Sequence, residues 1–312
     1  MRFPFDLPDD RDFDVAGFGT NAVDFLIRVP EYPGFNSKVE LTEYIKAAGG
    51  EVATTMVGLQ RLGVRTLYAG RFGGDDAGDF GRESLRAEGV DISLAESVAA
   101  ARTQIAFIII DERNGERTVI WHRDHRLAYS AAEAPLEIAE RTRIVHFTPH
   151  DAEACIALAR RAKELGTIVS IDLDNIFPKL EELLPLVDIL ITSAELPSRM
   201  LDIADRHKAL KEMHSRFGSA VVGITLGEHG SLLYSGGQFV ETAGFQVPGG
   251  CKDTTGAGDS FRAGLLFGVL NKLPVDESAR WANAVAALKC RRIGARTSLP
   301  SVDEVTTLLK KY

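Results

Sequence analysis

The chain alternates short runs of β-forming apolar residues with longer stretches in which apolar residues recur at helical spacing. Several of the short runs are apolar at every position, as in residues 105–110 (Ile-Ala-Phe-Ile-Ile-Ile). Runs of this kind suit strands that are buried on both faces of a sheet. Regular alternation of strands and helices indicates a mainly parallel sheet with helices on both faces. We therefore predict a doubly wound α/β fold, and we interpret residues 1–312 as a single domain.

The individual elements follow from the same pattern. The apolar runs predict strands at Phe13–Gly17, Thr66–Ala69, Ile105–Asp111, Thr118–Trp121, Ile144–Phe147, Ile168–Asp172, Asp188–Ile191, Ala220–Thr225 and Ser231–Tyr234. The helical spacing predicts helices at Val52–Leu62, Ala77–Glu88, Asp151–Leu165, Asp205–Phe217, Ala257–Asn271 and Val275–Arg292.

Two regions interrupt this alternation. Residues 26–47 are strand-like, with Pro and Gly in their turns, and residues 102–121 form a hairpin pattern around Asn114-Gly115, which is a strong turn signal. Neither region can cover the parallel sheet by itself, so we expect both to form a small β lid that stands off its edge. Ligands of such sheets bind beyond the carboxyl ends of the strands, where a lid excludes water.

Composition and charge exclude several classes of protein. Hydrophobic residues make up 45% and charged residues 26%, as in folded soluble proteins, and no apolar run is long enough for a transmembrane helix. The net charge of −8 disfavours nucleic acid as a partner. Residues 1–14 lack the apolar segment of a signal peptide, and the scattered Cys155, Cys251 and Cys290 favour a reducing compartment. We therefore expect a cytoplasmic protein without membrane contact.

Residues 253–264 carry the strongest chemical signal. Their sequence is Asp-Thr-Thr-Gly-Ala-Gly-Asp-Ser-Phe-Arg-Ala-Gly, and a helical apolar pattern follows. A glycine-rich turn at a helix start presents backbone N–H groups, and the helix dipole favours an anion there. Asp259 lies inside this turn, where a carboxylate can take the proton of a hydroxyl that attacks a bound phosphoryl group. The stretch therefore predicts a site for phosphorylating an alcohol.

The seven residues from Asp253 to Asp259 also resemble the C-terminal signature Asp-Thr-x-Gly-Ala-Gly-Asp of the PfkB (ribokinase-like) carbohydrate kinases, and every specified position matches. Weaker similarity runs from about Phe13 to Pro300. The resemblance implies a ribokinase-like fold, a sugar substrate, ATP and Mg²⁺ as cofactors, and a homodimer paired through the β lid. It also implies that Asp259 is the catalytic base and that backbone amides stabilise the transferred group, at Gly256, Ala257 and Gly258.

The resemblance assigns the sugar to residues near the first strands. Asp24 matches the family acid that accepts hydrogen bonds from sugar hydroxyls, and Gly49-Gly50 matches a glycine pair that serves as a hinge and sugar contact. Thr54 stands where the family usually has Asn, which leaves the identity of the sugar open. In ketohexokinase-like members an acidic sugar contact falls at the position of Asn36.

Other matches concern the nucleotide. Ketohexokinase-like members have an arginine that reaches the nucleotide phosphates at the position of Arg117. Residues 225–230 (Thr-Leu-Gly-Glu-His-Gly) match the family's Thr-x-Gly-x-x-Gly turn, which lets adenine and phosphates approach the backbone. With the anion turn, the resemblance implies further ATP contacts at Thr225, Gly227, Gly230, Thr255, Gly256, Gly258 and Asn283.

Magnesium ligands are less clearly encoded. The family often has Asn-x-x-Glu after a later strand, with the Glu organising Mg²⁺ through water, but Ser193 and Leu196 stand at these two positions. Asp172 and Glu195 are the candidates that remain. The family's site for a monovalent cation such as K⁺ uses backbone carbonyls, and its counterparts here are Asp253, Thr255, Gly294 and Ser298.

We expect an ATP-dependent kinase that transfers the γ-phosphate to a primary hydroxyl of a small sugar or sugar acid. The resemblance around Arg117 and Ser193 favours a ketose-like substrate. A nucleoside kinase of the same fold is the alternative, with Phe107 or Trp121 against the base.

Three other functions fit the sequence less well. A sugar phosphate acceptor would need extra basic residues near the lid, such as Arg102 and Arg123. A non-catalytic sugar or nucleotide sensor would have lost its base, whereas Asp259 is present. A dehydrogenase is disfavoured, because the residues after the first strand do not complete Gly-x-Gly-x-x-Gly.

Overall fold

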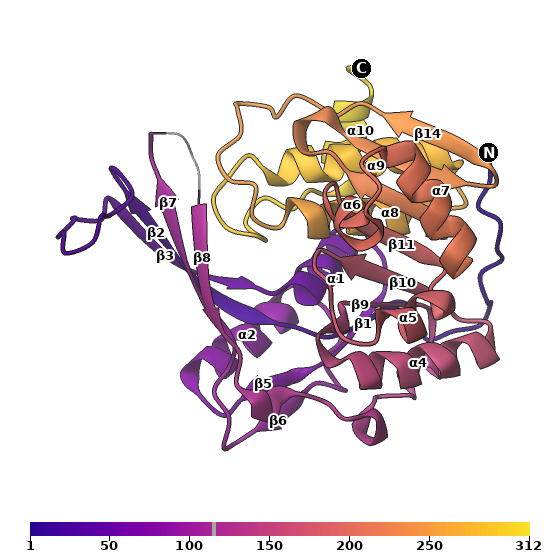
Figure 1. The fold of residues 1–312 in the computed structure, drawn as a ribbon. Helices are drawn as coiled ribbons and strands as arrows, with labels where there is room; N and C mark the ends of the chain where they lie inside the picture. The colour runs from indigo at the N-terminus through magenta and orange to yellow at the C-terminus, as the bar shows by residue number, and fades with distance from the viewer. Residues whose placement is uncertain (114–116) are drawn as a thin grey trace.

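A computed structural model describes residues 1–113 and 117–312, and an eight-stranded sheet forms its centre (Figure 1). The strand order is β14-β13-β12-β11-β10-β9-β1-β4, and the strands are parallel from β12 through β4 and antiparallel from β12 to β14. The strands span Phe13–Phe18 (β1), Thr66–Ala69 (β4), Thr142–Phe147 (β9), Ile168–Leu173 (β10), Ile189–Ser193 (β11), Val221–Thr225 (β12), Ser231–Ser235 (β13) and Gln238–Thr242 (β14). The expected α/β sheet is confirmed.

Both faces of this sheet are buried, because successive strand residues point to opposite sides and both sets are apolar. Val15 and Ile144 pack into one core, and their neighbours Ala16 and Val145 pack into the other. The first core is closed by α1 (Glu51–Arg61), α2 (Asp76–Ala87), α8 (Ala257–Leu270) and α9 (Val275–Lys289). The second is closed by α3 (Ile138–Arg141), α4 (Ala152–Leu165), α5 (Leu180–Leu183), α6 (Leu196–Leu201) and α7 (Arg206–Phe217). The last helix, α10 (Val302–Leu309), packs on α9.

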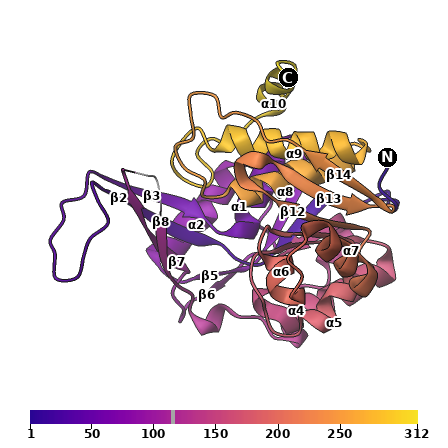
Figure 2. The same ribbon diagram turned by 45° about the horizontal axis from the view of Figure 1, so that its top comes forward.

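A separate four-stranded sheet forms the lid, and Figures 1 and 2 show it projecting from the main body. Its order is β3-β2-β7-β8, with β2 (Ala22–Val29), β3 (Glu43–Gly49), β7 (Ile105–Asp111) and β8 (Arg117–His122). A short pair, β5 (Arg71–Gly73) and β6 (Glu96–Val98), lies below it. The expected Asn114-Gly115 turn lies outside the described residues.

The two faces of the lid differ. Leu26, Ala106 and Ile108 are buried and pack near Ile293 of the main body, so they mark the inner face. The register carries this inner face across the sheet as the rows Ala47–Asp24–Ala106–Trp121 and Ile45–Leu26–Ile108–Val119. The intervening residues form the outer face, where Phe25 stacks on Tyr44 and Phe107 with ring centroids 6.1 and 5.1 Å apart.

The lid strands extend beyond the expected ranges. β2 begins at Ala22, four residues before residue 26, so Asp24 lies on a lid strand. The sequence pattern also missed β14, which is a half-exposed edge strand with little alternation, and α10, which begins at a Ser301–Glu304 capping box. Within the described ranges, no helix combines the length and the apolar character needed to cross a bilayer.

Candidate active site

The glycine-rich turn leads directly into α8. Gly256 caps the helix with φ of 79°, a left-handed conformation, and a side chain there would lie about 3.0 Å from the backbone of Ala295. The Asp253 carboxylate accepts hydrogen bonds from the N–H and hydroxyl of Thr255, at 2.8 and 2.7 Å. The turn is therefore held by its own side chains, with the helix N-terminus aimed at the lid side.

One of the three expected amides is already engaged. The N–H of Ala257 donates to the carbonyl of Thr254 at 3.1 Å, because residues 254–257 form a tight turn. The structure therefore corrects the expectation that Ala257 offers its amide to a ligand. The amide of Gly258 remains the better candidate, since Gly258 lines the large cleft described next.

A cleft of about 1110 Å³ opens beside the turn, between β12, the loop after β14, and the helices α8 and α9. Of the residues expected to contact ATP, it is lined by Thr225, Gly227, Gly230, Gly258 and Asn283. The Asn283 amide donates to Ser231 and to the carbonyls of Thr242 and Ala243, at 3.2–3.3 Å, so it also fixes the wall of the cleft. Thr255 and Gly256 belong to the turn itself.

The lid reaches this turn through Arg117. The exposed guanidinium of Arg117 donates a hydrogen bond to the hydroxyl of Thr254, which lines the cleft. An arginine at this position offers several N–H donors to the space where phosphates on the turn would lie.

Asp259 lies in the first turn of α8 and is partly exposed. Its backbone carbonyl accepts a hydrogen bond from the Thr55 hydroxyl at 3.3 Å, which ties α8 to α1. Desolvation and the charges of Asp172 and Glu51 raise the pKa of Asp259 well above its usual range, against the opposing charge of Arg262. A raised pKa suits a group that must accept a proton during a reaction.

Asp172 is the penultimate residue of β10 and forms a buried ion pair with Arg262 of α8. Arg262 also donates to the carbonyl of Ile191 at 3.3 Å. Burial raises the pKa of Asp172 to about 7 although Arg262 opposes this shift. Asp172 therefore belongs to the same group of charges as Asp259.

Sequence reasoning missed a glutamate–histidine pair that belongs to this group of charges. Glu51, at the start of α1, lies 3.2 Å from the His150 ring nitrogen and accepts from the Thr20 hydroxyl at 3.4 Å. Burial acts to raise the pKa of Glu51, but the hydrogen bond and charge of His150 outweigh it and hold the pKa below its usual range. In the sequence, the only feature that could have pointed to Glu51 as a site residue is its position directly after Gly49-Gly50.

The acceptor side of the site contains Asp24, which is 6% exposed. Its carboxylate packs against the Cα of Gly49 so closely that any side chain there would overlap it. Burial raises the pKa of Asp24 to about 6, and the neighbouring Arg296 opposes this rise. Asp24 and Asp259 thus both contact the Gly49–Thr55 segment, Asp24 at Gly49 and Asp259 through its backbone at Thr55.

Thr54 does not face this space. It is fully buried, and its hydroxyl accepts from the Arg296 Nε at 3.3 Å. Arg296 also donates to Ser84 at 3.3 Å and to the carbonyl of Gly49. The expected sugar contact at Thr54 is therefore corrected: Thr54 supports Arg296, a residue that the sequence did not single out.

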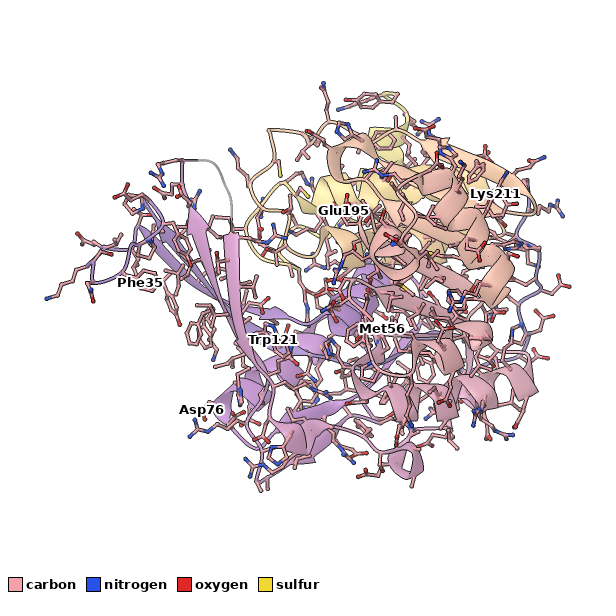
Figure 3. The ribbon with its side chains drawn as sticks, viewed as in Figure 1. Phe35, Met56, Asp76, Trp121, Glu195 and Lys211 are labelled. Carbon is pink, nitrogen blue, oxygen red and sulfur yellow. The ribbon has the colours of Figure 1, made fainter. Side chains whose placement is uncertain are left out.

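Asn36 is also not brought to the site. It lies in the exposed loop between β2 and β3, and Figure 3 labels the neighbouring Phe35 at the tip of the lid, away from the main body. The structure therefore corrects the expectation that Asn36 contacts the sugar, because Asn36 lies in the exposed loop whereas Asp24 is buried.

Glu195 likewise faces solvent. Its side chain is 78% exposed and lies 3.7 Å from Arg206, at a shallow pocket beside α6 and α7 (Figure 3). The structure does not support Glu195 as the acid near magnesium. Glu195 is the residue just before α6, and its side chain points to solvent there. Among the described residues, no group of three or more His, Cys, Asp or Glu side chains has the geometry to hold a metal ion.

Comparisons with known proteins agree with this geometry. The model of the pfkB family of carbohydrate kinases matches residues 13–302. A nucleoside kinase of Methanothermobacter thermautotrophicus is 30% identical over 96% of this chain and 95% of its own. An ATP-dependent ribose-1-phosphate kinase of Halopiger xanaduensis is 30% identical over 92% and 95%. The structure of Arabidopsis thaliana ribokinase with ribose and ATP superposes with a TM-score of 0.85 at 25% identity, over 96% of this chain and 99% of that one, which confirms the ribokinase-like fold.

Proposed function

The chain belongs to the pfkB family of carbohydrate kinases, and from this premise we propose that it transfers the γ-phosphate of ATP to a primary hydroxyl of a small sugar, with a ketose favoured. The observation that carries the proposal is the position of Asp259. Asp259 lies in the first turn of α8, directly after the anion turn, and its carboxyl group has a raised pKa. Its backbone carbonyl is bonded to Thr55 of α1, the helix that follows Gly49 and the neighbouring Asp24.

In this proposal each side of the site has one task. Adenine lies in the cleft between β12 and α9, and the γ-phosphate lies at the N-terminus of α8 with Gly258 and Arg117 beside it. Asp24 accepts hydrogen bonds from sugar hydroxyls and orients the ring. Asp259 accepts the proton of the primary hydroxyl as its oxygen attacks the γ-phosphorus and the bond to the β-phosphate oxygen breaks.

Magnesium fits this arrangement as a partner of the nucleotide. Mg²⁺ is commonly held by one or two carboxylates and by substrate phosphates, and when bound it neutralises the charge of the β- and γ-phosphates. Asp172 and Glu51 supply carboxylates in the group around Asp259. The enzyme is proposed to work in the cytoplasm, where ATP and Mg²⁺ are supplied.

The test of this function is ADP release from Mg·ATP with a panel of ketoses, aldoses, sugar acids, sugar phosphates and nucleosides. One strong acceptor, with a phosphorylated product of matching mass, is the expected result. ATP binding without turnover across the panel would instead favour the sensor.

Charge favours an uncharged acceptor over a sugar acid or sugar phosphate. Arg123 is neutralised by Asp151 through two hydrogen bonds of 2.9 and 2.7 Å, and each nitrogen of the Arg296 guanidinium already donates a hydrogen bond, to Thr54, Ser84 or Gly49. Arg102 lines a different pocket, with Ile105 and His122 of the outer lid face. The two arginines considered for a sugar phosphate are therefore not available to one at Asp24.

A nucleoside is the second candidate, and Trp121 is the observation that favours it. Trp121 shares the inner row of the lid with Ala106 and Asp24, and 58% of its surface is exposed (Figure 3). Two strand spacings, about 9.5 Å, separate the backbones of Trp121 and Asp24, with only the methyl group of Ala106 between them. A ring bound through its hydroxyls at Asp24 would meet the indole. Phe107, the other aromatic considered, lies on the outer face and is stacked on Phe25.

Replacing Trp121 with Ala is expected to lower kcat/KM for the best acceptor roughly tenfold, mainly through KM, because an aromatic contact is lost. Trp121→Phe should retain most of the activity. Phe35→Ala removes a fully exposed lid aromatic and serves as the matched control. Equal effects of Trp121→Ala on KM for acceptor and for ATP would argue against a contact with the acceptor.

We also propose that the chain forms a homodimer through the outer face of the lid, because this face exposes Tyr44, Phe107 and Ile120 together. Phe107→Asp is expected to halve the mass measured by light scattering, since a charge would be buried in the interface. Phe35→Asp on the lid loop is the control. A wild-type protein that is monomeric at micromolar concentration would contradict the proposal.

A further inference from the structure

A lysine is buried beside the anion turn. Lys289 is the last residue of α9, and its side chain is 0% exposed. Its ammonium donates a hydrogen bond of 2.8 Å to the carbonyl of Asp253 and lies 3.6 Å from the Asp253 carboxylate. A buried ammonium is costly unless it is paired and hydrogen-bonded, so this position is a specific one. Burial lowers the pKa of Lys289, and the charge of Asp253 opposes that shift.

Lys289 contacts the same Asp253 oxygens that a monovalent cation would need as ligands. The resemblance to the family places a K⁺ site at the oxygens of Asp253 and Thr255 and near Gly294 and Ser298. Here the Asp253 carbonyl is bonded to the ammonium, and its carboxylate accepts from the N–H of Gly294 at 2.8 Å. The Ser298 hydroxyl donates to the carbonyl of Lys289 itself. These residues do not fit a K⁺ ion while the ammonium is present, so the expected K⁺ site is corrected.

We propose that the ammonium of Lys289 takes the place of the monovalent cation in this chain, so that catalysis does not depend on K⁺. The proposal rests on the proposed function, because it assigns the anion turn to phosphate binding. An ammonium and K⁺ carry the same charge, and both are bound by carbonyl and carboxylate oxygens. Lys289 holds Asp253, and Asp253 in turn holds the N–H and hydroxyl of Thr255 at the entry to the turn. Lys289 is thus a positioning residue for the amides that follow.

A tethered cation differs from a dissolved one in that it is always present. Because the ammonium is attached to the chain, its charge is present at every K⁺ concentration. The entropy cost of fixing it in place is met when the protein folds, not when a cation binds. The end of α9 is also joined to the segment before the turn, because the carbonyl of the next residue, Cys290, accepts from the Lys252 N–H at 2.8 Å.

The first measurement is the rate of ADP release by the wild-type enzyme in KCl and in choline chloride at equal ionic strength. We expect the two rates to agree within about twofold. Lys289→Ala removes the charge and opens a space, so its rate in choline chloride should fall at least about tenfold, the size expected for losing a charged hydrogen bond. KCl or ammonium chloride should then restore much of that loss.

Two further variants separate a cation effect from a structural one. Lys289→Met fills the space without a charge, so it should be slow and should respond little to K⁺. Lys252→Ala removes an exposed lysine one residue before Asp253 and should match the wild type in both salts. A merely structural lysine would leave Lys289→Ala equally slow in KCl and choline chloride.

Thermal melting provides a readout that does not depend on turnover. KCl, compared with choline chloride, should raise the melting temperature of Lys289→Ala and leave that of the wild type unchanged. Strong K⁺ stimulation of the wild-type rate, or a Lys289→Ala variant that K⁺ neither stabilises nor activates, would overturn the proposal. If Lys289→Ala does not fold, the wild-type comparison still decides. Absence of ADP release with every acceptor and salt would refute the kinase function instead, and melting would still test Lys289.

Discussion

Asp259→Asn is expected to lower kcat by at least about 10²-fold, with little change in the KM for ATP. The amide is nearly the same size as the carboxylate, but it cannot accept the proton of the attacking hydroxyl. The N-terminus of α8 and the cleft beside it remain intact, so ATP should bind as before. The loss would therefore appear in the chemical step.

The measurement is steady-state ADP release with the best acceptor, beside an ATP-induced shift in melting temperature. Asp303→Asn is a matched control, because Asp303 also lies in the first turn of a helix, α10, and is exposed. Unchanged turnover in Asp259→Asn would refute its role as the base. A lost ATP-induced shift would mean that Asp259 organises the nucleotide.

The pH dependence of the wild type follows from the same groups. Asp259 acts as a base only when deprotonated, and its pKa is raised by burial and neighbouring carboxylates. Thus kcat should fall as pH decreases through a value well above that of an ordinary carboxyl group. Asp24, with a pKa of about 6, should weaken acceptor binding when it is protonated, so KM for the acceptor should rise below about pH 6. A flat profile from pH 8 to pH 5 would contradict both assignments.

The features that local sequence could predict are those built from neighbouring residues. The anion turn, Gly256 as its left-handed cap and Asp259 in the first turn of α8 all lie within one short segment. The apolar runs of β1, β9, β10 and β12 show directly that the sheet is buried on both faces. Propensity and spacing act over a few residues, so they are readable without the fold.

The features that could not be predicted depend on contacts between distant segments. Arg296 is 242 residues from Thr54 and more than that from Gly49, yet its guanidinium binds both. Glu51 and His150 are 99 residues apart. Lys289 lay inside the helix predicted at Val275–Arg292, and nothing in its local sequence shows that α9 brings its ammonium to Asp253. Such buried polar contacts depend on how helices and strands pack together. They determine which residues can play the roles that the sequence assigned to them.

Thr54 illustrates the consequence for specificity. A residue at the position of a family sugar contact faces Arg296 instead, and Arg296 lies beside Asp24. Burial lowers the pKa of Arg296 to about 10, against the charge of Asp24, and its hydrogen bonds keep it fixed. The acceptor side is therefore organised by Asp24 and by Arg296, whose charge acts on Asp24 without a direct hydrogen bond between them.

Gly49→Ala is the second change for which we expect a large effect, a fall in kcat/KM of about 10²-fold. A methyl group on Gly49 would overlap the Asp24 carboxylate and would force that side chain to turn away from its present position. The Gly49 carbonyl also accepts a hydrogen bond from Arg296, so movement of this segment would disturb Arg296 as well as Asp24. Displacement of an orienting group by about 1 Å is enough for a loss of this size.

The measurement is kcat and KM for acceptor and for ATP in Gly49→Ala, with Gly34→Ala as the control. Gly34 lies in the lid loop with nothing within 4 Å of an added methyl group, so that variant should behave as the wild type. The KM for ATP should hardly change, because no residue of the Gly49–Thr55 segment lines the nucleotide cleft, while acceptor turnover collapses. An equal loss of ATP binding, or a melting temperature so low that the protein is unfolded at the assay temperature, would mean that Gly49 is needed for folding and not specifically for acceptor binding. Asp24→Asn must then decide, since the amide fits beside Gly49 and removes only the charge that orients the acceptor.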